Sequence, residues 1–238
     1  MIKKIVGCIP NTSTCLNLLS GCLAIIFTFR YGGNASPCGL TGYELAYAAM
    51  GAAAVFDFLD GASARLLKAF SPLGKDLDSL SDLVSFGVAP AMLVFSIMNS
   101  YSPSALMPFA ALLIPAFGAL RLAKFNNDPG QATEFRGLPI PANAIFWIGV
   151  GGWISKYMYP GDIAMLLLIA LMCAAMVGSF RMLSLKFKNF SLRENFSRYI
   201  IILAAIGFVA FYGLAGLAWV ILLYFLISFM RLNRRQAK

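Results

Sequence analysis

Long apolar stretches with almost no charged side chains recur along the chain and restrict the folds open to it. A run of about 20 apolar residues is enough to cross a bilayer as an α-helix. The 238 residues are 60% hydrophobic and 12% charged, and the mean hydropathy is +0.77, so an ordinary soluble domain is excluded. The sequence predicts an all-α fold, a polytopic membrane helical bundle. About eight membrane segments are expected, at residues 13–33, 43–69, 76–99, 104–125, 140–158, 161–182, 198–212 and 214–231.

The first segment and the last two segments can each be interpreted in two ways. Lys3 and Lys4 precede an apolar stretch, as in cleavable signal peptides. We favour a retained first helix that follows an interruption at Pro10, because no small-x-small cleavage site is followed by a soluble domain. The last two segments are separated only by Gly213, so they form either a tight hairpin or one re-entrant unit.

Basic residues gather at alternate connections between the segments. Apart from Arg30 and Lys156, all Lys and Arg lie at the N-terminus, at the second-third, fourth-fifth and sixth-seventh connections, or in the C-terminal tail. The positive-inside rule then predicts a multi-pass protein of the cytoplasmic membrane with both termini in the cytoplasm. The net charge of +9 is mainly this topology signal, with attraction to the anionic lipid bilayer as a second effect. No nucleic-acid partner is expected, because no binding fold accompanies the scattered charges.

The absence of histidine excludes several kinds of chemistry. Ser-His and Cys-His nucleophiles are impossible, and so are His-ligated zinc or iron sites. The five cysteines show no metal-binding spacing, and only Cys38 falls in a predicted outer loop, so a disulfide framework is not expected. Metal chemistry, if present, depends on oxygen ligands.

Four aspartates interrupt the apolar pattern at helical spacing. Asp57 and Asp60 are three residues apart, and Asp78 and Asp82 are four apart, so each pair projects from one face of a helix. An ionised Asp at the bilayer centre costs roughly 2.5–3.5 kcal/mol, so four together need a compensating cation. Clustered carboxylates suit Mg²⁺ or Mn²⁺, and magnesium usually takes substrate phosphates as further ligands. The sequence therefore indicates a metal site and a phosphorylated substrate.

A helical hairpin brings the two pairs together. Ser71 is a good N-cap and Pro72 a good first helical residue, so the chain is expected to turn near residue 71. Asp60 precedes this turn by 11 residues and Asp82 follows it by 11, which places both roughly 16 Å from the turn. The alternative is that the carboxylates are solvated at helix ends or paired with nearby basic residues, Arg65, Lys68 and Lys75.

Small residues accompany the aspartates. Gly61 and Ala64 share the helical strip of Asp57, and Gly74 leads the strip of the second pair. They let a flat group approach the backbone or serve close helix packing, and the spacing leaves both roles open. Arg65, one turn past Gly61, can pair with a carboxylate or a phosphate.

The pattern D-x-x-D-G-x-x-A-R-x8-G-x3-D-x3-D at residues 57–82 resembles the complete signature of the CDP-alcohol phosphotransferase family. More narrowly, residues 8–190 are similar to its integral-membrane phosphatidylserine synthase branch. This similarity includes residues 78–90, 121–126, 137–141 and the opening Pro10-Asn11-x-x-Thr14-x-x-Asn17. The resemblance implies a six-helix transmembrane core in residues 1–190 and an added C-terminal helical hairpin with a basic tail in residues 191–238.

The resemblance also implies roles for individual residues. The divalent metal would be held by Asp57, Asp60 and Asp78, with Asp82 near the metals as a further ligand and the general base. Gly61, Ala64 and Gly74 match positions around the cytidine nucleotide, and Arg65 matches the motif arginine. In the implied reaction the hydroxyl of L-serine attacks the β-phosphoryl of CDP-diacylglycerol and CMP is released, without a covalent enzyme intermediate. A homodimer is expected from the family.

The sequence gives weaker indications of substrate-binding residues outside the signature. The serine carboxylate calls for a cation, and polar residues gather at one connection: Arg121, Lys124, Asn126 and Arg136. Ordinary topology-determining charges are the alternative reading for this group. Thr14 and Asn17 are candidates to line the nucleotide site, with helix capping as the alternative. Two other functions remain open, transfer to glycerol phosphate, inositol phosphate or another acceptor, and ion-coupled transport, although no inverted repeat favours transport.

Overall fold

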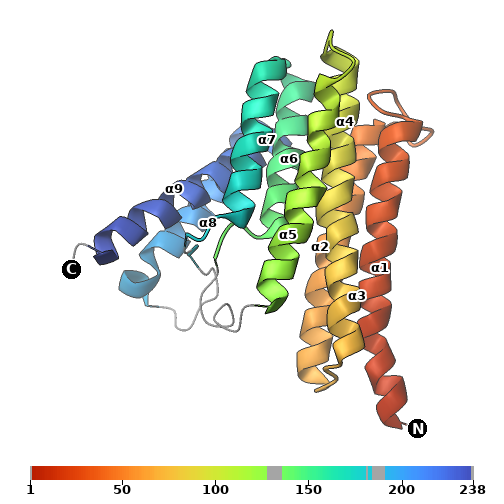
Figure 1. Ribbon diagram of the computed structural model, residues 1–238, viewed down its shortest axis with the longest axis vertical. Helices are drawn as coiled ribbons and strands as arrows, with labels where there is room; N and C mark the ends of the chain where they lie inside the picture. The colour runs from red at the N-terminus through yellow and green to blue at the C-terminus, as the bar shows by residue number, and fades with distance from the viewer. Residues whose placement is uncertain (1, 128–135, 181, 184–190, 237–238) are drawn as a thin grey trace. The chain divides into compact units, whose positions relative to one another are not determined.

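All regular elements of the described residues are helices. The computed structural model describes residues 2–127, 136–180, 182–183 and 191–236 (Figure 1). Five helical runs within them are long and apolar enough to cross a membrane, which confirms the predicted polytopic all-α membrane fold. These runs are Pro10–Arg30, Gly42–Leu66, Pro72–Tyr101, Met107–Asn127 and Asn195–Met230.

The predicted segments differ from the observed helices in three places. Helix α1 spans Ile2–Arg30 with Pro10 inside it, so the predicted interruption at Pro10 is wrong; membrane helices tolerate proline where other groups satisfy the freed backbone. Helices α6 (Ile140–Lys156) and α7 (Asp162–Val177) have 17 and 16 residues, fewer than a typical membrane span. The basic residues Arg181, Lys186 and Lys188 of the sixth-seventh connection lie outside the described residues.

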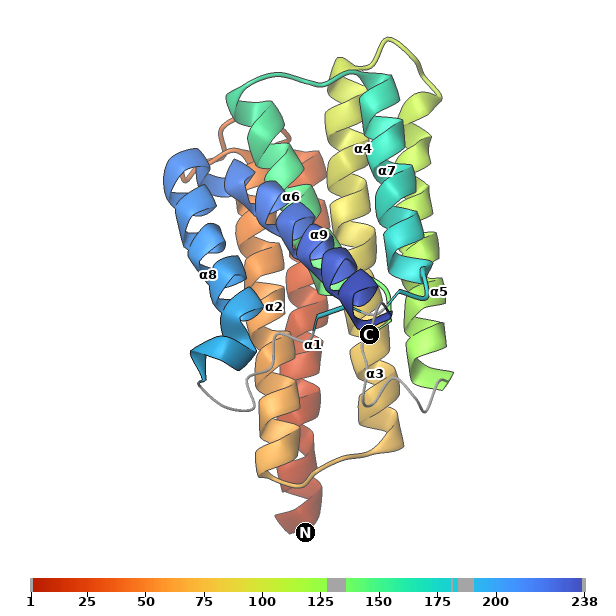
Figure 2. The ribbon, with the colours of Figure 1, turned by 90° about the vertical axis from the view of Figure 1, so that its left-hand side faces the viewer.

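The chain divides into two compact units, residues 1–122 and 123–238. In the first unit α1 lies along α2 and also contacts α3 (Figure 2). The elements of this unit are α1, α2 (Gly42–Leu66), α3 (Pro72–Asp82), η1 (Leu83–Val88), α4 (Ala89–Tyr101), η2 (Met107–Leu112) and the first part of α5 (Leu113–Asn127).

Local sequence determines both ends of the α2–α3 hairpin. At the start of α2, the Thr41 hydroxyl accepts a hydrogen bond from the Glu44 amide, and the Glu44 carboxylate accepts one from the Thr41 amide, which is a capping box. At the start of α3, Ser71 Oγ accepts from the Gly74 amide at 3.0 Å, and Pro72 is the first helical residue. The predicted turn near residue 71 is therefore confirmed.

A π-helical turn, η1, joins α3 to α4. The amide of Ala89 donates to the carbonyl of Val84, five residues earlier. Pro90 has no amide hydrogen, and its ring would clash with the carbonyl four residues before it in a regular α-helix, so we attribute the wider turn to this proline. A Cβ on Gly21 would lie 2.4 Å from Ser85 Oγ and 2.7 Å from Ser85 Cα, so α1 and η1 are in direct contact at this glycine.

In the second unit the last two segments form a hairpin. Helix α8 (Leu192–Tyr212) ends at Gly213, whose φ is +63°, and α9 (Gly216–Gln236) runs back against it, so the hairpin alternative holds. Helix α9 also packs on α6, where a Cβ on Gly149 would lie 2.1 Å from the Ala218 nitrogen. Glycine is thus needed for this helix contact.

The segment that precedes α6 docks on the end of α7. The Gly137 amide donates to Phe180 O at 2.9 Å, and the Leu138 amide donates to Ala175 O at 2.8 Å. Gly137 has a φ of +71°, and a Cβ there would lie 2.4 Å from Met176 O. Glycine is therefore required by both the backbone conformation and the close contact.

Candidate metal and substrate site

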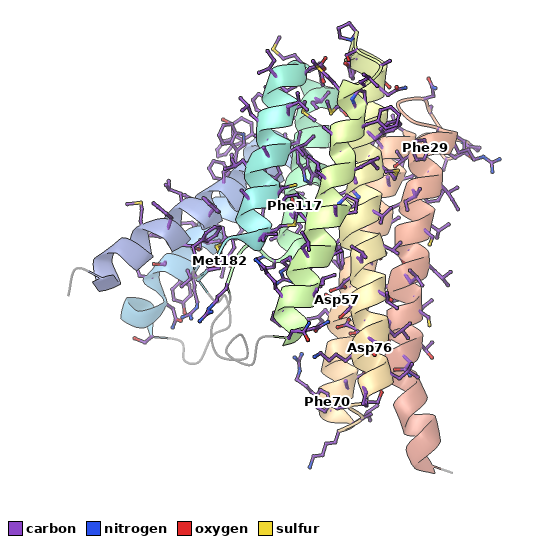
Figure 3. All side chains as sticks on the ribbon, viewed as in Figure 1. Phe29, Asp57, Phe70, Asp76, Phe117 and Met182 are labelled. Atoms are coloured by element: carbon purple, nitrogen blue, oxygen red, sulfur yellow. The ribbon has the colours of Figure 1, made fainter. Side chains whose placement is uncertain are left out.

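Three carboxylates of the first unit converge. One oxygen each of Asp57, Asp60 and Asp78 lies within 4.8 Å of the others. Asp57 and Asp60 belong to α2 and Asp78 to α3, so the hairpin assembles the group from both of its helices. In Figure 3, Asp57 lies part of the way along this unit, with Phe70 at the α2–α3 turn and Phe29 towards the opposite end. The cluster is therefore set back from the turn, as the sequence predicts.

The donor set fits a divalent cation. All three side chains offer hard oxygen ligands, the type that Mg²⁺ and Mn²⁺ prefer. Asp78 Oδ1 is buried and has no hydrogen-bond partner among the described residues. A buried carboxylate oxygen without a donor is costly unless a cation compensates it. Asp57, Asp60 and Asp78 are the residues that would hold the metal.

Helix α1 supplies uncharged hydrogen-bond partners. Thr14 Oγ1 lies 2.8 Å from Asp60 Oδ2 and 3.0 Å from Pro10 O, so its single proton is shared between them. Asn17 Nδ2 donates to Asp82 Oδ1 at 3.2 Å. Both side chains are buried in the middle of α1, so the helix-capping alternative for Thr14 and Asn17 is wrong.

Asp82 lies beside the cluster of three. It ends α3, one turn beyond Asp78, and it is close enough to Asp57 and Asp78 for electrostatic repulsion. The guanidinium of Arg121, in α5, is within electrostatic reach of Asp82. Arg121 is 8% exposed, so a buried cation accompanies the fourth carboxylate.

The two motif glycines have different surroundings. A Cβ on Gly61 would meet no atom within 4 Å, so close helix packing among the described residues does not explain this glycine. A Cβ on Gly74 would lie 3.2 Å from Asn11 Oδ1 and 3.0 Å from Ser71 Oγ, so Gly74 lets α1 approach α3. Ala64 is partly buried one turn from Gly61, and Arg65 is exposed at the end of α2.

The four candidates for the acceptor pocket have different described contacts. Arg121 and Lys124 lie one turn apart on α5, where the boundary between the two units falls, and Arg121 is within electrostatic reach of Asp82. Lys124 Nζ donates to Val177 O at 3.3 Å, at the end of α7. Among the four, Arg121 has a described electrostatic interaction with an aspartate of the site.

Two serines of this region did not emerge from the sequence pattern. Ser85 Oγ donates to the carbonyl of Asn17 at 2.9 Å, and the buried Ser81 Oγ has no hydrogen-bond partner among the described residues. Ser81 and Ser85 continue the helical strip of Asp78 and Asp82 in a span that is otherwise mostly apolar. Polar residues at that spacing are the signal that would have identified them.

These features define an integral-membrane protein with a carboxylate cluster on a helical hairpin that fits a divalent cation. The chain belongs to the CDP-alcohol phosphatidyltransferase family, whose model matches residues 7–180. The matched range contains all four aspartates and both glycines of the site.

Curated relatives carry one common description. The chain is 38% identical over 168 residues to the CDP-diacylglycerol--serine O-phosphatidyltransferase of Methanocaldococcus jannaschii, covering 70% of this chain and 71% of that protein. It is 36% identical over 165 residues to the Mycobacterium leprae protein of that description, covering 63% and 51%. The Helicobacter pylori protein is 29% identical over 228 residues, covering 93% and 90%. The chain thus spans about half the length of the mycobacterial relative and nearly all of the Helicobacter one.

Proposed function

We propose that the protein transfers the phosphatidyl group of CDP-diacylglycerol to the hydroxyl of L-serine, giving phosphatidylserine and CMP. The observation that carries this proposal is the convergence of Asp57, Asp60 and Asp78 beside the buried Asp82, on the helical hairpin that bears the family signature. Relatives described as CDP-diacylglycerol--serine O-phosphatidyltransferases support serine as the acceptor.

The proposed reaction is one direct displacement at phosphorus. The serine oxygen forms a bond to the β-phosphorus of CDP-diacylglycerol. The bond from that phosphorus to the bridging oxygen breaks, and this oxygen leaves with the electron pair as part of CMP. The hydroxyl proton passes to the carboxylate of Asp82 and from there to solvent. No group of the chain becomes covalently attached to the lipid.

The acidic residues divide into metal ligands and a base. Asp57, Asp60 and Asp78 would hold Mg²⁺ or Mn²⁺, which when bound neutralises charge on the diphosphate. Asp82 stands outside that trio yet within reach of it, which suits a residue that accepts a proton next to the reacting phosphate. Asp82 also remains a candidate to complete the ligand set.

The nucleotide and the serine are assigned to different residues near the carboxylates. The open space at Gly61 leaves room for the cytidine moiety, with Ala64, Gly74 and Arg65 on the same hairpin. Thr14 reaches the site through Asp60. Arg121, buried beside Asp82, is our candidate for the serine carboxylate, because a guanidinium binds a carboxylate with two parallel hydrogen bonds.

Sidedness follows from the charges in the sequence. We place both termini and the site on the cytoplasmic face of the cell membrane, because basic residues gather at the connections on that side. A homodimer and a division between residues 1–190 and 191–238 are also part of the proposal. The family match ends at residue 180, but the Helicobacter relative covers 93% of the chain, so the C-terminal segments are shared with at least that protein.

The decisive experiment measures CMP release. Purified protein in detergent or liposomes should release CMP from CDP-diacylglycerol only when L-serine is added, and mass spectrometry should identify phosphatidylserine as the lipid product. EDTA should abolish the reaction, and Mg²⁺ or Mn²⁺ should restore it. Full activity in a metal-free preparation would remove the metal from the proposal.

A parallel acceptor screen tests the substrate. Glycerol phosphate, inositol phosphate and other alcohols replace serine in the same assay. Release of CMP with one of these compounds, and none with serine, would keep the reaction class and change the acceptor. Ion-coupled transport, the remaining alternative, has no supporting observation in a chain that belongs to a phosphatidyltransferase family.

A further inference from the structure

Asn17 contacts the α3–η1 segment at two points. Its side-chain Nδ2 donates to Asp82 Oδ1 at 3.2 Å, and its backbone carbonyl accepts from Ser85 Oγ at 2.9 Å. The Asn17 side chain is fully buried. The two partners are three residues apart, one at the end of α3 and one in the π turn, so both the side chain and the backbone of Asn17 are attached to the helix that carries Asp82.

The surrounding backbone fixes this arrangement. Gly21 lies one turn beyond Asn17 on α1, and any side chain there would overlap with Ser85. We attribute the π turn that contains Ser85 to Pro90, whose ring disfavours a regular α-helix at that point. The approach of α1 to Asp82 thus depends on a glycine on one side and a proline-imposed turn on the other.

We infer that Asn17 is a positioning residue for Asp82, and that it acts on the proposed reaction through that carboxylate rather than by lining the nucleotide site. The inference rests on the proposed function. The amide NH₂ of Asn17 only donates, so it occupies one oxygen of Asp82 without competing for the proton.

This role and the nucleotide-lining role predict different kinetics. A residue that orients the base affects the chemical step, so its loss lowers kcat and leaves the KM for CDP-diacylglycerol unchanged. Loss of a residue that touches the nucleotide instead raises the KM for CDP-diacylglycerol. Loss of a residue that only packs α1 against η1 lowers the melting temperature. Its effect on kcat is then independent of the effect of Asp82→Asn when the two substitutions are combined.

The variants are Asn17→Ala, which removes the donated hydrogen bond without adding a charge, and Asn17→Leu, which keeps the approximate volume. We expect kcat to fall about ten- to a hundredfold, the usual effect of losing a partner that orients a functional group. The KM for CDP-diacylglycerol and its metal-dependent binding should not change. If Asn17→Leu does not fold, Asn17→Ala decides the test.

A double variant measures whether Asn17 acts through Asp82. Asn17→Ala combined with Asp82→Asn should be no slower than Asp82→Asn alone, because the loss of an orienting partner has no effect once the base is absent. Ser85→Ala should lower kcat less than the Asn17 variants, since it removes only the backbone contact. Ser20→Ala is the matched control. Ser20 is buried on α1, and its Oγ donates to Leu16 O at 2.8 Å. The kcat of Ser20→Ala should equal that of the wild type.

The outcomes separate this inference from the proposed function. If Asp82→Asn abolishes CMP release but the Asn17 variants keep the wild-type kcat, the positioning role is wrong and the proposed function stands. A raised KM for CDP-diacylglycerol at unchanged kcat overturns the positioning role in favour of nucleotide contact. Wild-type turnover in Asp82→Asn overturns both the base assignment and the inference. If the acceptor proves to be another alcohol, the same measurements with that alcohol decide.

Discussion

At the scale of single residues, the site contains carboxylates with unequal surroundings. Asp60 shares the proton of Thr14, Asp78 has a buried oxygen without a donor, and Asp82 accepts from the amide of Asn17. Because of these differences, the same Asp→Asn substitution should have different effects at the different positions. Replacing Asp by Asn keeps the shape of the side chain and removes one negative charge in every case.

Asp82→Asn and Asp60→Asn should therefore have different effects. Asp82→Asn removes the proposed base, so turnover should fall about 10²–10⁴-fold while metal-dependent binding of CDP-diacylglycerol persists. Asp60→Asn removes a charge that the cation requires, so both binding and turnover should fall. Steady-state CMP release and calorimetric binding of CDP-diacylglycerol with Mg²⁺ measure the two quantities. If Asp82→Asn loses affinity as strongly as Asp60→Asn, Asp82 is chiefly a ligand.

Arg121 offers a test of acceptor binding. Arg121→Ala should raise the KM for serine by roughly ten- to a hundredfold, since a hydrogen bond to a charged group contributes about 1.5–3 kcal/mol. Arg121→Lys should recover part of this affinity, because it keeps the charge but not the two parallel donors. Lys124→Ala is the control, because Lys124 is exposed and donates to the backbone of Val177. A normal serine KM in Arg121→Ala would place the acceptor pocket elsewhere.

At the scale of helices, glycine controls how closely α1 approaches the site. A Cβ on Gly21 would overlap with the backbone of Ser85, whereas a Cβ on the exposed Gly51 of α2 would meet no atom within 4 Å. The same substitution at these two positions therefore tests helix propensity with and without a steric clash.

Gly21→Ala should lower the free energy of unfolding by about 1–3 kcal/mol through overpacking, and it should reduce turnover because α1 carries Asn17. Gly51→Ala should leave turnover unchanged and stabilise the helix by about 0.5–1 kcal/mol. Thermal unfolding in detergent and CMP release measure both effects. Equal behaviour of the two variants would mean that α1 has room to move away from Ser85.

The hairpin and the carboxylate cluster could be predicted from sequence because local signals determine them. Ser71 and Pro72 mark a helix start, and the helical spacing of the aspartates gives their shared faces. The π turn could not be predicted, since it depends on how the chain accommodates Pro90. The partners of Asp60 and Asp82 on α1 depend on long-range packing, which spacing within one helix does not report.

At the scale of the whole molecule, topology determines which compartment reaches the site. Cys38 lies exposed in the loop before α2, and Lys68 lies exposed at the α2–α3 turn, so the two residues are at opposite ends of α2. A helix of 25 residues is long enough to cross the bilayer between them.

Thiol labelling tests this topology. In a chain that keeps only Cys38, a membrane-impermeant maleimide should label right-side-out vesicles. In a cysteine-free chain that carries Lys68→Cys, it should label only inverted vesicles. Detergent-solubilised samples of both chains control for thiol reactivity. The reverse labelling pattern would place the aspartates towards the outer face, away from cytoplasmic serine.

The π turn has a further consequence for comparing this chain with others. A turn with five-residue hydrogen bonds holds an extra residue relative to a regular helix. Deleting one residue between Asp82 and Pro90 would convert this turn to a regular helical turn, so α4 would keep its buried and exposed sides and the signature at residues 57–82 would be unchanged. A homologous protein with a regular helix here should align with a one-residue gap at this point, and the helices of the two chains should be in phase on both sides of that gap.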